Sequence, residues 1–231
     1  MSLVLCELAD ASSAGVLSYS PFCLKVHLAL RLAGLSYTRQ HGARPDAWRA
    51  QNPTGQVPVL VVEGRPLADS TEILHWMVQA GHLAATPEAW LWEELADTAL
   101  NAFVVAARWA DEQNWPRTRD AYFPTMPALL RRVIPAFIRR RVVGSLVARD
   151  VWRAGPARCW ERYGRLLDAL EARAPEPGTS WVGGERWTVA DVALYGQLRS
   201  LATALTPAQS AALQARRRLW AWLEALERAS G

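Results

Sequence analysis

The sequence lacks the residues and patterns that mark several functional classes. Its 231 residues contain three cysteines (Cys6, Cys23 and Cys159), too few for a disulfide framework. We therefore expect a reducing, cytoplasmic setting. The four histidines are scattered without the spacing of metal ligands, and neither a Gly-rich phosphate loop nor a Ser-His-Asp pattern is present. We expect no metal cofactor.

Long apolar runs are also missing. No run is long enough to span a bilayer, and the first ten residues lack the basic region and continuous apolar stretch of a signal peptide. With 51% hydrophobic and 21% charged residues, the composition is that of a globular protein. There is no internal repeat and no low-complexity tract, so one large domain or two modest ones are expected.

The formal net charge is +4, and much of the excess lies in one basic run. The run comprises Arg131, Arg132, Arg139, Arg140 and Arg141. We interpret it as a solvated helix face, which is the usual role of such runs. The alternative is an anionic partner, either a polyanionic ligand or a membrane surface contacted by an amphipathic helix. We favour the solvated face over membrane contact and expect no nucleic-acid partner.

The first third of the chain alternates between strand and helix patterns. We predict strands at Leu3–Leu8 and Leu35–Gln40, with a helix over Pro21–Ala33 between them. That helix begins with a proline, which suits a first turn, and Gly34 stops it. Ala47–Gln51 allows at most one helical turn. This order predicts a small mixed sheet flanked by helices.

Residues 52–74 carry the most informative pattern. Val59–Val62 and Pro66–Ala68 predict two strands joined by a tight hairpin turn. Asp69 and Ser70 then precede apolar residues at helical spacing. The start of a helix offers free N–H groups and a positive dipole end, which attract a carboxylate.

Val57 and Pro58 stand just before the first of these strands. An X-Pro bond is the one place where a cis peptide costs little. A cis bond here would turn the backbone N–H and C=O of Val57 outward, where they could pair with an extended peptide. Together with the helix start, this predicts a site for a small acidic peptide.

Beyond a linker at Gly81–Glu88, the apolar spacing predicts only helices. They are expected within residues 90–104, 129–147, 159–172, 188–205 and 207–229. The fold class is therefore an α/β part followed by an all-helical part, with domains at residues 1–80 and 89–231. Thr188 and Asp191 form a capping box with Asp in place of the usual Glu, and we expect its role to be structural.

Three patterns, in this order, resemble the glutathione S-transferase superfamily. They are Ser20-Pro21-Phe22-Cys23 at the first helix, Val57-Pro58 followed by Asp69-Ser70, and the Thr188–Asp191 box. The resemblance implies a thioredoxin-like N-terminal domain with a mixed four-stranded sheet, an all-helical C-terminal domain and a homodimer. The phrase SPFCLKVHLALRLAGLSY is further similar to the branch with failed-axon-connections, metaxin-like and related bacterial transferase-like proteins.

The resemblance also implies a glutathione site. Val57, before Pro58, would clamp the cysteinyl part of glutathione through its backbone, and Gln56 would lie near the peptide. Asp69 and Ser70 take the place of the family's acidic-Ser pair, which holds the γ-glutamyl group. Here Asp replaces the commoner Glu and shortens the reach by one methylene. The other interpretation of Asp69 and Ser70 is an ordinary helix N-cap.

Ser20 is the catalytic candidate that the resemblance implies. Its hydroxyl and free N–H could face the bound thiol, and a hydrogen bond to the thiolate lowers the thiol pKa. Tyr19 is the alternative donor, and a plain N-cap is the alternative role for Ser20. The segment from Ser20 to Cys23 resembles a redox C-x-x-C that has lost its leading cysteine, so dithiol chemistry is disfavoured.

A second substrate would bind between the domains. The aromatic candidates for its apolar pocket are Trp109, Trp115, Tyr122 and Phe123, and core packing is the alternative for each. The leading function is conjugation of glutathione, as substrate, to a hydrophobic electrophile in detoxification. The alternatives are glutathione-dependent peroxide reduction and a non-catalytic binding or scaffold protein.

Overall fold

The fold is known from a computed structural model that describes residues 1–42, 47–124, 126–149 and 151–231. The side chains of residues 13, 128, 129, 131 and 132 also lie outside the described part, and with them two arginines of the predicted basic run, Arg131 and Arg132. The N-terminal elements are β1 (Leu3–Glu7), the 3-10 turn η1 (Ser12–Ala14), α1 (Pro21–Leu32), β2 (Thr38–His41), β3 (Val59–Val62), β4 (Arg65–Ala68) and α2 (Ser70–Gln79).

The four strands form one mixed sheet in the order β2-β1-β3-β4. β1 pairs parallel with β2 and antiparallel with β3, while β3 and β4 form an antiparallel hairpin. Glu63 and Gly64 make its turn with φ values of 49° and 81°, the backbone that a two-residue hairpin turn requires. This sheet confirms the fold class predicted for the N-terminal part.

Side chains alternate between the two faces of the sheet, as the pleat requires. Leu5 and Leu60 belong to the main core, on the face that α1 and α2 cover. Cys6 and Val59 point to the other face, where they pack with the buried ring of Trp48. The predicted helical turn at residues 47–51 is a series of hydrogen-bonded turns that covers this second face.

Among its described residues, the C-terminal part contains helices and no strand. The helices are α3 (Pro87–Leu95), α4 (Asn101–Val105), α5 (Trp115–Tyr122), α6 (Ala128–Ala148), α7 (Gly155–Arg173), α8 (Val189–Leu201), α9 (Pro207–Gln214) and α10 (Arg217–Ala229). Two π-helical segments, η2 (Ala96–Leu100) and η3 (Ala106–Ala110), flank α4. The run from α3 to η3 is therefore continuous and helical. Within the described residues, no helix is long and apolar enough to cross a membrane.

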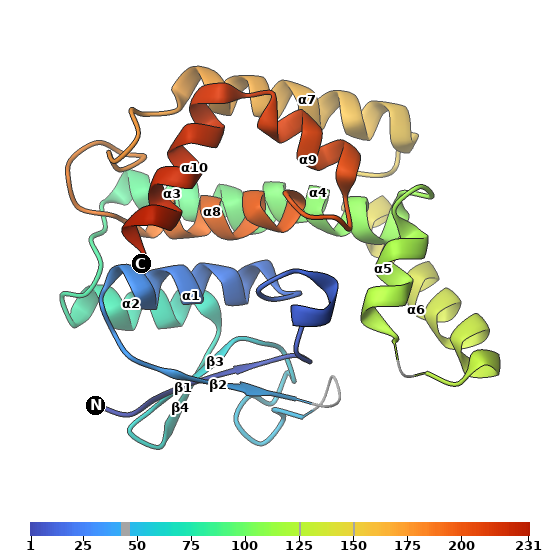
Figure 1. The fold of residues 1–231 in the computed structure, drawn as a ribbon, viewed down its shortest axis with the longest axis horizontal. Coiled ribbons are helices and arrows are strands. Elements are labelled where there is room, and N and C mark those ends of the chain that lie inside the picture. Colours follow the sequence, from blue (N-terminus) through green and yellow to red (C-terminus); the bar gives the residue numbers. More distant parts are fainter. Residues whose placement is uncertain (43–46, 125, 150) are drawn as a thin grey trace.

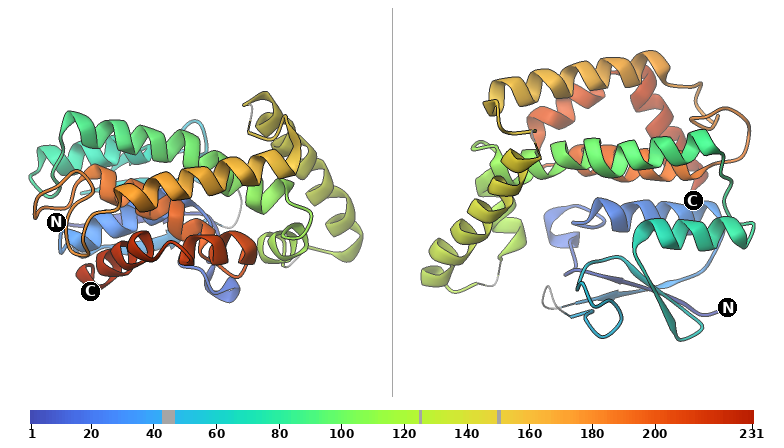
Figure 2. Two further views of the ribbon diagram at one scale, coloured as in Figure 1. Left: turned by 90° about the horizontal axis from the view of Figure 1, so that it is seen from above. Right: turned by 180° about the vertical axis from the view of Figure 1, so that it is seen from behind.

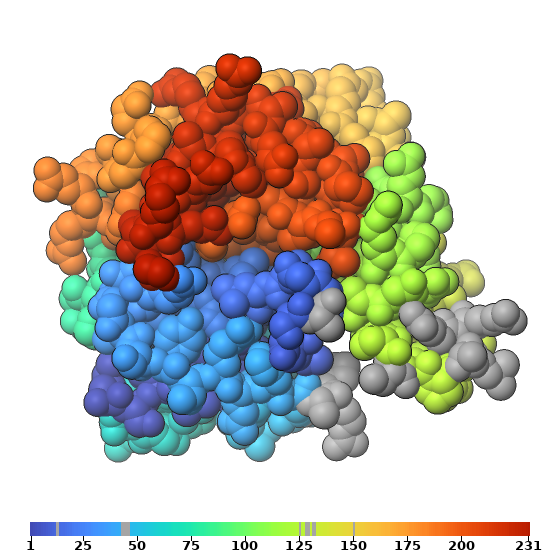
Figure 3. All heavy atoms as spheres, viewed as in Figure 1, coloured from blue at the N-terminus to red at the C-terminus, as the bar shows by residue number. Residues whose placement is uncertain are grey.

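The helices form layers above the sheet. α1 and α2 lie directly on it, the α3–η3 run and α8 lie above them, and α7, α9 and α10 form the outermost layer (Figure 1). α5 and α6 stand to one side of these layers, which the views from above and behind also show (Figure 2). The N-terminal and C-terminal parts meet along a broad interface (Figure 3).

α8 is the central helix of this arrangement. All its residues but one are buried, and it packs against α1 at Gly196, where an added Cβ would lie 2.5 Å from the Pro21 carbonyl oxygen. Its start carries the predicted capping box. The Asp191 carboxylate accepts hydrogen bonds from the Thr188 N–H and hydroxyl, each at 2.7 Å. It also accepts from Ser180 Oγ and the Trp181 N–H, again at 2.7 Å.

Some predicted boundaries are wrong. The second strand begins at Thr38 instead of Leu35, because the Leu35 N–H donates to the Leu30 carbonyl at 3.0 Å and keeps Leu35 in the cap of α1. α8 ends at Leu201 instead of Leu205. α5 was not predicted, since its sequence, WPRTRDAY, has little apolar spacing.

Candidate functional site

A cavity of about 310 Å³ lies at the N-terminal end of α2, between the sheet part and the C-terminal helices. The five residues predicted to bind glutathione all line it: Gln56, Val57, Pro58, Asp69 and Ser70. The other lining residues are Phe22, Asn52, Thr54, Ala68, Thr71 and Asp97. The structure therefore places both ends of the segment from Asn52 to Leu74 on one cavity.

The Val57–Pro58 peptide bond is cis. In the described part of the chain, neither the N–H nor the C=O of Val57 makes a backbone hydrogen bond. The preceding loop is held by Asn52, whose Nδ2 donates to the Gln56 carbonyl at 2.9 Å and whose Oδ1 accepts from the Thr54 N–H at 3.1 Å. The Val57 backbone is thus fixed in place and open to pairing from the cavity.

Asp69 and Ser70 form the opposite wall. Asp69 is the N-cap of α2, where its carboxylate accepts from the Thr71 N–H at 2.8 Å. Its φ of 79° is unusual for a residue with a side chain. Such outliers gather at binding sites, where the surrounding structure enforces them. The hydroxyl of Ser70 makes no hydrogen bond within the described residues, although Ser70 is buried.

A buried cluster of charges forms the floor behind this wall. Lys25 of α1 is fully buried and places Nζ 2.5 Å from Glu93 Oε1 and 2.6 Å from Asp97 Oδ2. Thr71 adds a hydrogen bond to Glu93 at 2.6 Å. Burial raises the pKa of Asp97, against the opposing effect of Lys25. Because Asp97 also lines the cavity, the buried cluster contributes one carboxylate to its surface.

Ser20 is the N-cap of α1, and its Oγ accepts from the Cys23 N–H at 3.3 Å. Accepting this bond does not use the Ser20 hydroxyl hydrogen, which also lies within hydrogen-bond reach of the Cys23 sulfur. Tyr19 points elsewhere, because its hydroxyl donates to the Ala121 carbonyl at 2.8 Å. Neither Ser20 nor Tyr19 is among the described residues that line the cavity. Phe22, two residues after Ser20, does line the cavity.

Arg108 holds the backbone at Tyr19, directly before Ser20. This residue is not among those identified from the sequence. It is buried, and its guanidinium donates to the Tyr19 carbonyl at 2.5 Å, the Ser200 carbonyl at 2.7 Å and the Tyr122 hydroxyl at 3.0 Å. Three acceptors on different elements hold it rigidly. An arginine in an apolar helix gives no local sequence signal for this role.

The four aromatic candidates lie together on η3 and α5. The Trp109 ring lies 5.7 Å from that of Trp115 and 5.4 Å from that of Tyr122, and Tyr122 in turn contacts the Tyr19 ring at 4.6 Å. Phe123 follows at the end of α5. These rings pack on one another beside the Tyr19 segment, and none of them lines the cavity at α2 within the described residues.

The cysteines are buried and free. Burial raises the pKa of the Cys23 thiol, and it raises that of Cys6 to about 11 and that of Cys159 to about 12. A thiol in this state is a poor nucleophile. Among the described residues, no group of three or more His, Cys, Asp or Glu could hold a metal ion.

The described arginines of the basic run lie on α6. Arg139 is half-buried: it donates to the Trp109 carbonyl at 2.7 Å and to the exposed Glu112 at 2.8 Å, and it lies over the Trp115 ring. Arg140 and Arg141 are exposed. Phe137 on the same helix is 72% exposed, so this face is both apolar and basic.

Comparison with known families agrees with this architecture. A model of the glutathione S-transferase N-terminal domain matches residues 19–80, and a model of its C-terminal domain matches residues 135–225. Together they span about two thirds of the chain. The chain belongs to the glutathione S-transferase superfamily, with a thioredoxin-like N-terminal part followed by the helical domain.

Solved structures of similar fold come from several organisms. A possible glutathione S-transferase from Rhodopseudomonas palustris is 22% identical with a TM-score of 0.56, over 98% of this chain and 94% of that one. The enzyme from Ascaris lumbricoides is 18% identical (TM-score 0.57; 99% and 92% covered). One from Methylobacillus flagellatus with glutathione bound is 17% identical (TM-score 0.55; 98% of both chains covered). These likenesses show the fold alone. No curated protein matches the sequence.

Proposed function

We propose that this protein binds glutathione in the cavity at α2 and conjugates it to a hydrophobic electrophile. The observation that carries the proposal is the convergence of a free Val57 backbone, an unpartnered Ser70 hydroxyl and the N-terminal end of α2 on one cavity. An extended peptide with a carboxylate at one end satisfies all three. A relative of the same fold from Methylobacillus flagellatus carries bound glutathione, which supports the choice of ligand.

In this proposal Ser70 and the first N–H groups of α2 receive the γ-glutamyl carboxylate, while Val57 pairs with the cysteinyl residue. The thiol then points toward the start of α1. Ser20 turns its hydroxyl hydrogen from Cys23 to the glutathione sulfur, which favours the thiolate. Arg108 holds the Tyr19 carbonyl and so positions Ser20.

The reaction is nucleophilic substitution. The thiol loses its proton to solvent, the thiolate forms a bond to an electrophilic carbon, and the bond from that carbon to its leaving group breaks. The leaving group departs with the electron pair, as a halide does from an aryl halide. The protein's contribution is to orient the thiolate and lower the pKa of the thiol. Glutathione-dependent peroxide reduction would use the same thiolate.

A non-catalytic glutathione-binding or scaffold protein is the second candidate. Two observations favour it: Ser20 does not line the cavity within the described residues, and α6 exposes Phe137 beside Arg140 and Arg141. A scaffold needs a docking face and no activated thiol. The two candidates therefore differ in whether Ser20 matters to a measured rate.

The test begins with retention on immobilised glutathione, which both candidates allow. Rates with a panel of aryl halides and hydroperoxides are then measured for the native protein, Ser20→Ala, Ser20→Thr and Tyr19→Phe. We expect Ser20→Ala to lose about 100-fold in kcat/KM, Ser20→Thr to recover most of it and Tyr19→Phe to change little. An unchanged rate in Ser20→Ala would remove Ser20 from the mechanism, and absent turnover would favour the scaffold.

A further inference from the structure

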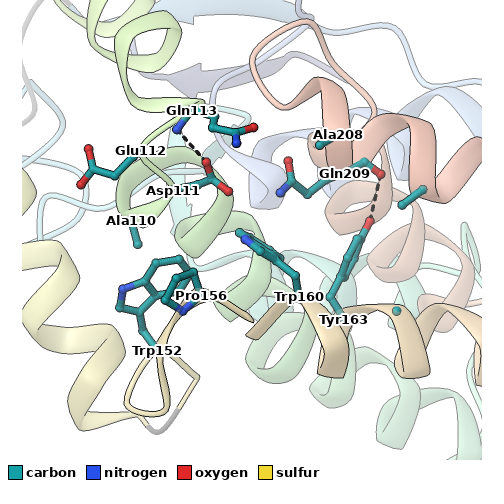
Figure 4. A pocket seen from close by; sticks show the side chains of 12 residues that line it. Ala110, Asp111, Glu112, Gln113, Trp152, Pro156, Trp160, Tyr163, Ala208 and Gln209 are labelled. Atoms are coloured by element: carbon teal, nitrogen blue, oxygen red, sulfur yellow. Dashed lines mark hydrogen bonds between the residues drawn. The ribbon is translucent and has the colours of Figure 1, made fainter. Parts of the chain in front are cut away.

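A second cavity lies away from the proposed glutathione site. It has a volume of about 650 Å³, which is within the range of pockets for small organic ligands. Three parts of the chain enclose it: residues 110–113 at the end of η3, Trp152 with the first turns of α7, and α9 (Figure 4). It shares no lining residue with the cavity at α2.

Three aromatic rings form one wall. The Trp152 ring meets the Trp160 ring edge-on at 5.8 Å, and Trp160 meets Tyr163 edge-on at 6.1 Å. The Tyr163 hydroxyl donates to the Gln209 carbonyl at 3.3 Å, which ties this wall to α9. These contacts hold the ring faces in place before any ligand arrives.

Gln209 forms the polar back of the cavity. Its side chain is almost fully buried, and its Oε1 accepts from Asn114 Nδ2 at 2.9 Å. Asn114 is anchored in turn to the Ala107 carbonyl at 3.0 Å. In Figure 4 the Gln209 amide and the Asp111 carboxylate lie on facing sides of the hollow. The Gln209 amide is therefore held in place, as the rings are.

The charge of the lining is opposite to that of the whole chain. Although the protein carries a formal charge of +4, the lining contains two carboxylates, Asp111 and Glu112, and no lysine, arginine or histidine among the described residues. Glu112 is 82% exposed and pairs outward with Arg139 at 2.8 Å. Asp111 is half-buried and accepts only the Gln113 N–H, at 2.9 Å, within the described residues. Asp111 is thus the carboxylate whose charge is available to a ligand in the cavity.

We propose that this cavity binds an organic cation, either a quaternary ammonium or a protonated amine on an apolar body. Ring faces of tryptophan and tyrosine attract a cation through their quadrupoles, and the attraction grows when water is excluded. Asp111 adds a full negative charge beside them. The apolar body fills the space against the small side chains of Ala208 and Ala212. An anionic ligand would find no basic residue among the described residues that line the cavity.

The site is independent of the glutathione proposal. Asp97, in the α2 cavity, and Ala110, in this one, are thirteen residues apart on the continuous run from α3 to η3. At 1.5 Å per residue this is about 20 Å. The cation would therefore be carried or sensed by the protein, and would not be positioned next to the thiol.

Isothermal titration calorimetry with benzyltrimethylammonium tests the site, and phenylmethanesulfonate, of similar shape and opposite charge, is the matched probe. We expect the cation to bind in the micromolar to low millimolar range, at least about tenfold more tightly than the anion. Saturating glutathione should leave its affinity unchanged. Equal binding of the two probes, or no heat from the cation at millimolar concentration, would overturn the proposal.

Two variants locate the binding. Asp111→Asn keeps the size of the side chain and should weaken binding by about tenfold, whereas the control Glu112→Gln should change it by about twofold or less. Trp152→Leu removes one ring face and should weaken binding independently of the carboxylate. Unfolding midpoints identify a variant that fails to fold. Native affinity in either folded Asp111→Asn or folded Trp152→Leu would contradict the proposal.

Discussion

Lys25 Nζ lies 2.6 Å from Asp97 Oδ2, and this contact joins α1 of the N-terminal part to η2 of the C-terminal part. Lys25 is the only lysine of the chain, and it is fully buried. A buried charge is tolerated only when it is paired and hydrogen-bonded. Two carboxylates meet it here, so the cluster fixes the C-terminal helices against the N-terminal part at the floor of the α2 cavity.

Lys25→Met should therefore destabilise the fold by about 3–5 kcal/mol, since it leaves Glu93 and Asp97 buried without a counter-charge. Denaturant unfolding followed by circular dichroism measures the change. The matched control is Arg158→Met, which removes an exposed ion pair with Glu161 and should leave the unfolding midpoint nearly unchanged. Equal effects of the two substitutions would show that the buried cluster does not hold the parts together.

Glu7 makes stability depend on pH. Burial alone would raise the pKa of Glu7, but hydrogen bonds from His27 and Arg39 outweigh burial and lower the pKa from 4.5 to about 2. An acid with a lowered folded pKa adds stability above its unfolded pKa and loses it as the pH falls through the folded pKa. The contribution, about 3 kcal/mol, should disappear between pH 4.5 and 2.

Glu7→Gln checks this window. The free energy of unfolding of the native protein should exceed that of the variant at pH 5.5, and the difference should shrink by at least about half at pH 3. A difference that stays constant across this range would mean that the Glu7 carboxylate is not the titrating group.

Asp191 accepts four hydrogen bonds at the start of α8, three more than the single bond to its carboxylate that the capping box requires. Asp191→Ala would leave the N–H groups of Trp181 and Thr188 buried without an acceptor, so we expect a loss of about 3 kcal/mol or more. Ser180→Ala removes only one of these bonds and should cost about 1 kcal/mol. Thermal unfolding of both variants tests this ranking, and a reversed order would contradict it.

Gly196 allows α8 to approach α1 closely. Gly196→Ala would place a Cβ 2.5 Å from the Pro21 carbonyl and 3.0 Å from the Lys25 nitrogen, both backbone atoms that cannot easily move. We expect a loss of about 1–3 kcal/mol. Gly144→Ala in α6 meets no atom within 4 Å and should be neutral or stabilise by up to about 1 kcal/mol. Similar midpoints for the two variants would refute this close contact.

Local patterns predicted much of the fold and one wall of the site. The hairpin from Val59 to Ala68, the N-cap at Asp69 and the capping box at Thr188 each depend on neighbouring residues, and all three are present. The branch of the superfamily suggested by the first helix stays a prediction.

Contacts between distant residues could not be predicted from the sequence. Lys25 meets Glu93 and Asp97 across 68 and 72 residues, and no local pattern marks that pairing. The cavity of about 650 Å³ depends on Trp152 and Trp160. Their spacing in the sequence is compatible with one face of a helix and does not indicate a cavity. Three of the four aromatics expected to line a substrate pocket, Trp109, Trp115 and Tyr122, pack their rings on one another, and the pocket role of the four stays a prediction.

The most direct test of the account is the affinity for glutathione of the native protein and of Ser70→Ala, measured by isothermal titration calorimetry. The substitution removes one hydroxyl from the α2 cavity and should not destabilise the fold, because that hydroxyl has no partner within the described residues. We predict saturable binding by the native protein and a Kd about tenfold higher for Ser70→Ala. No binding at millimolar glutathione, or the same Kd for both proteins, would contradict a glutathione site in this cavity.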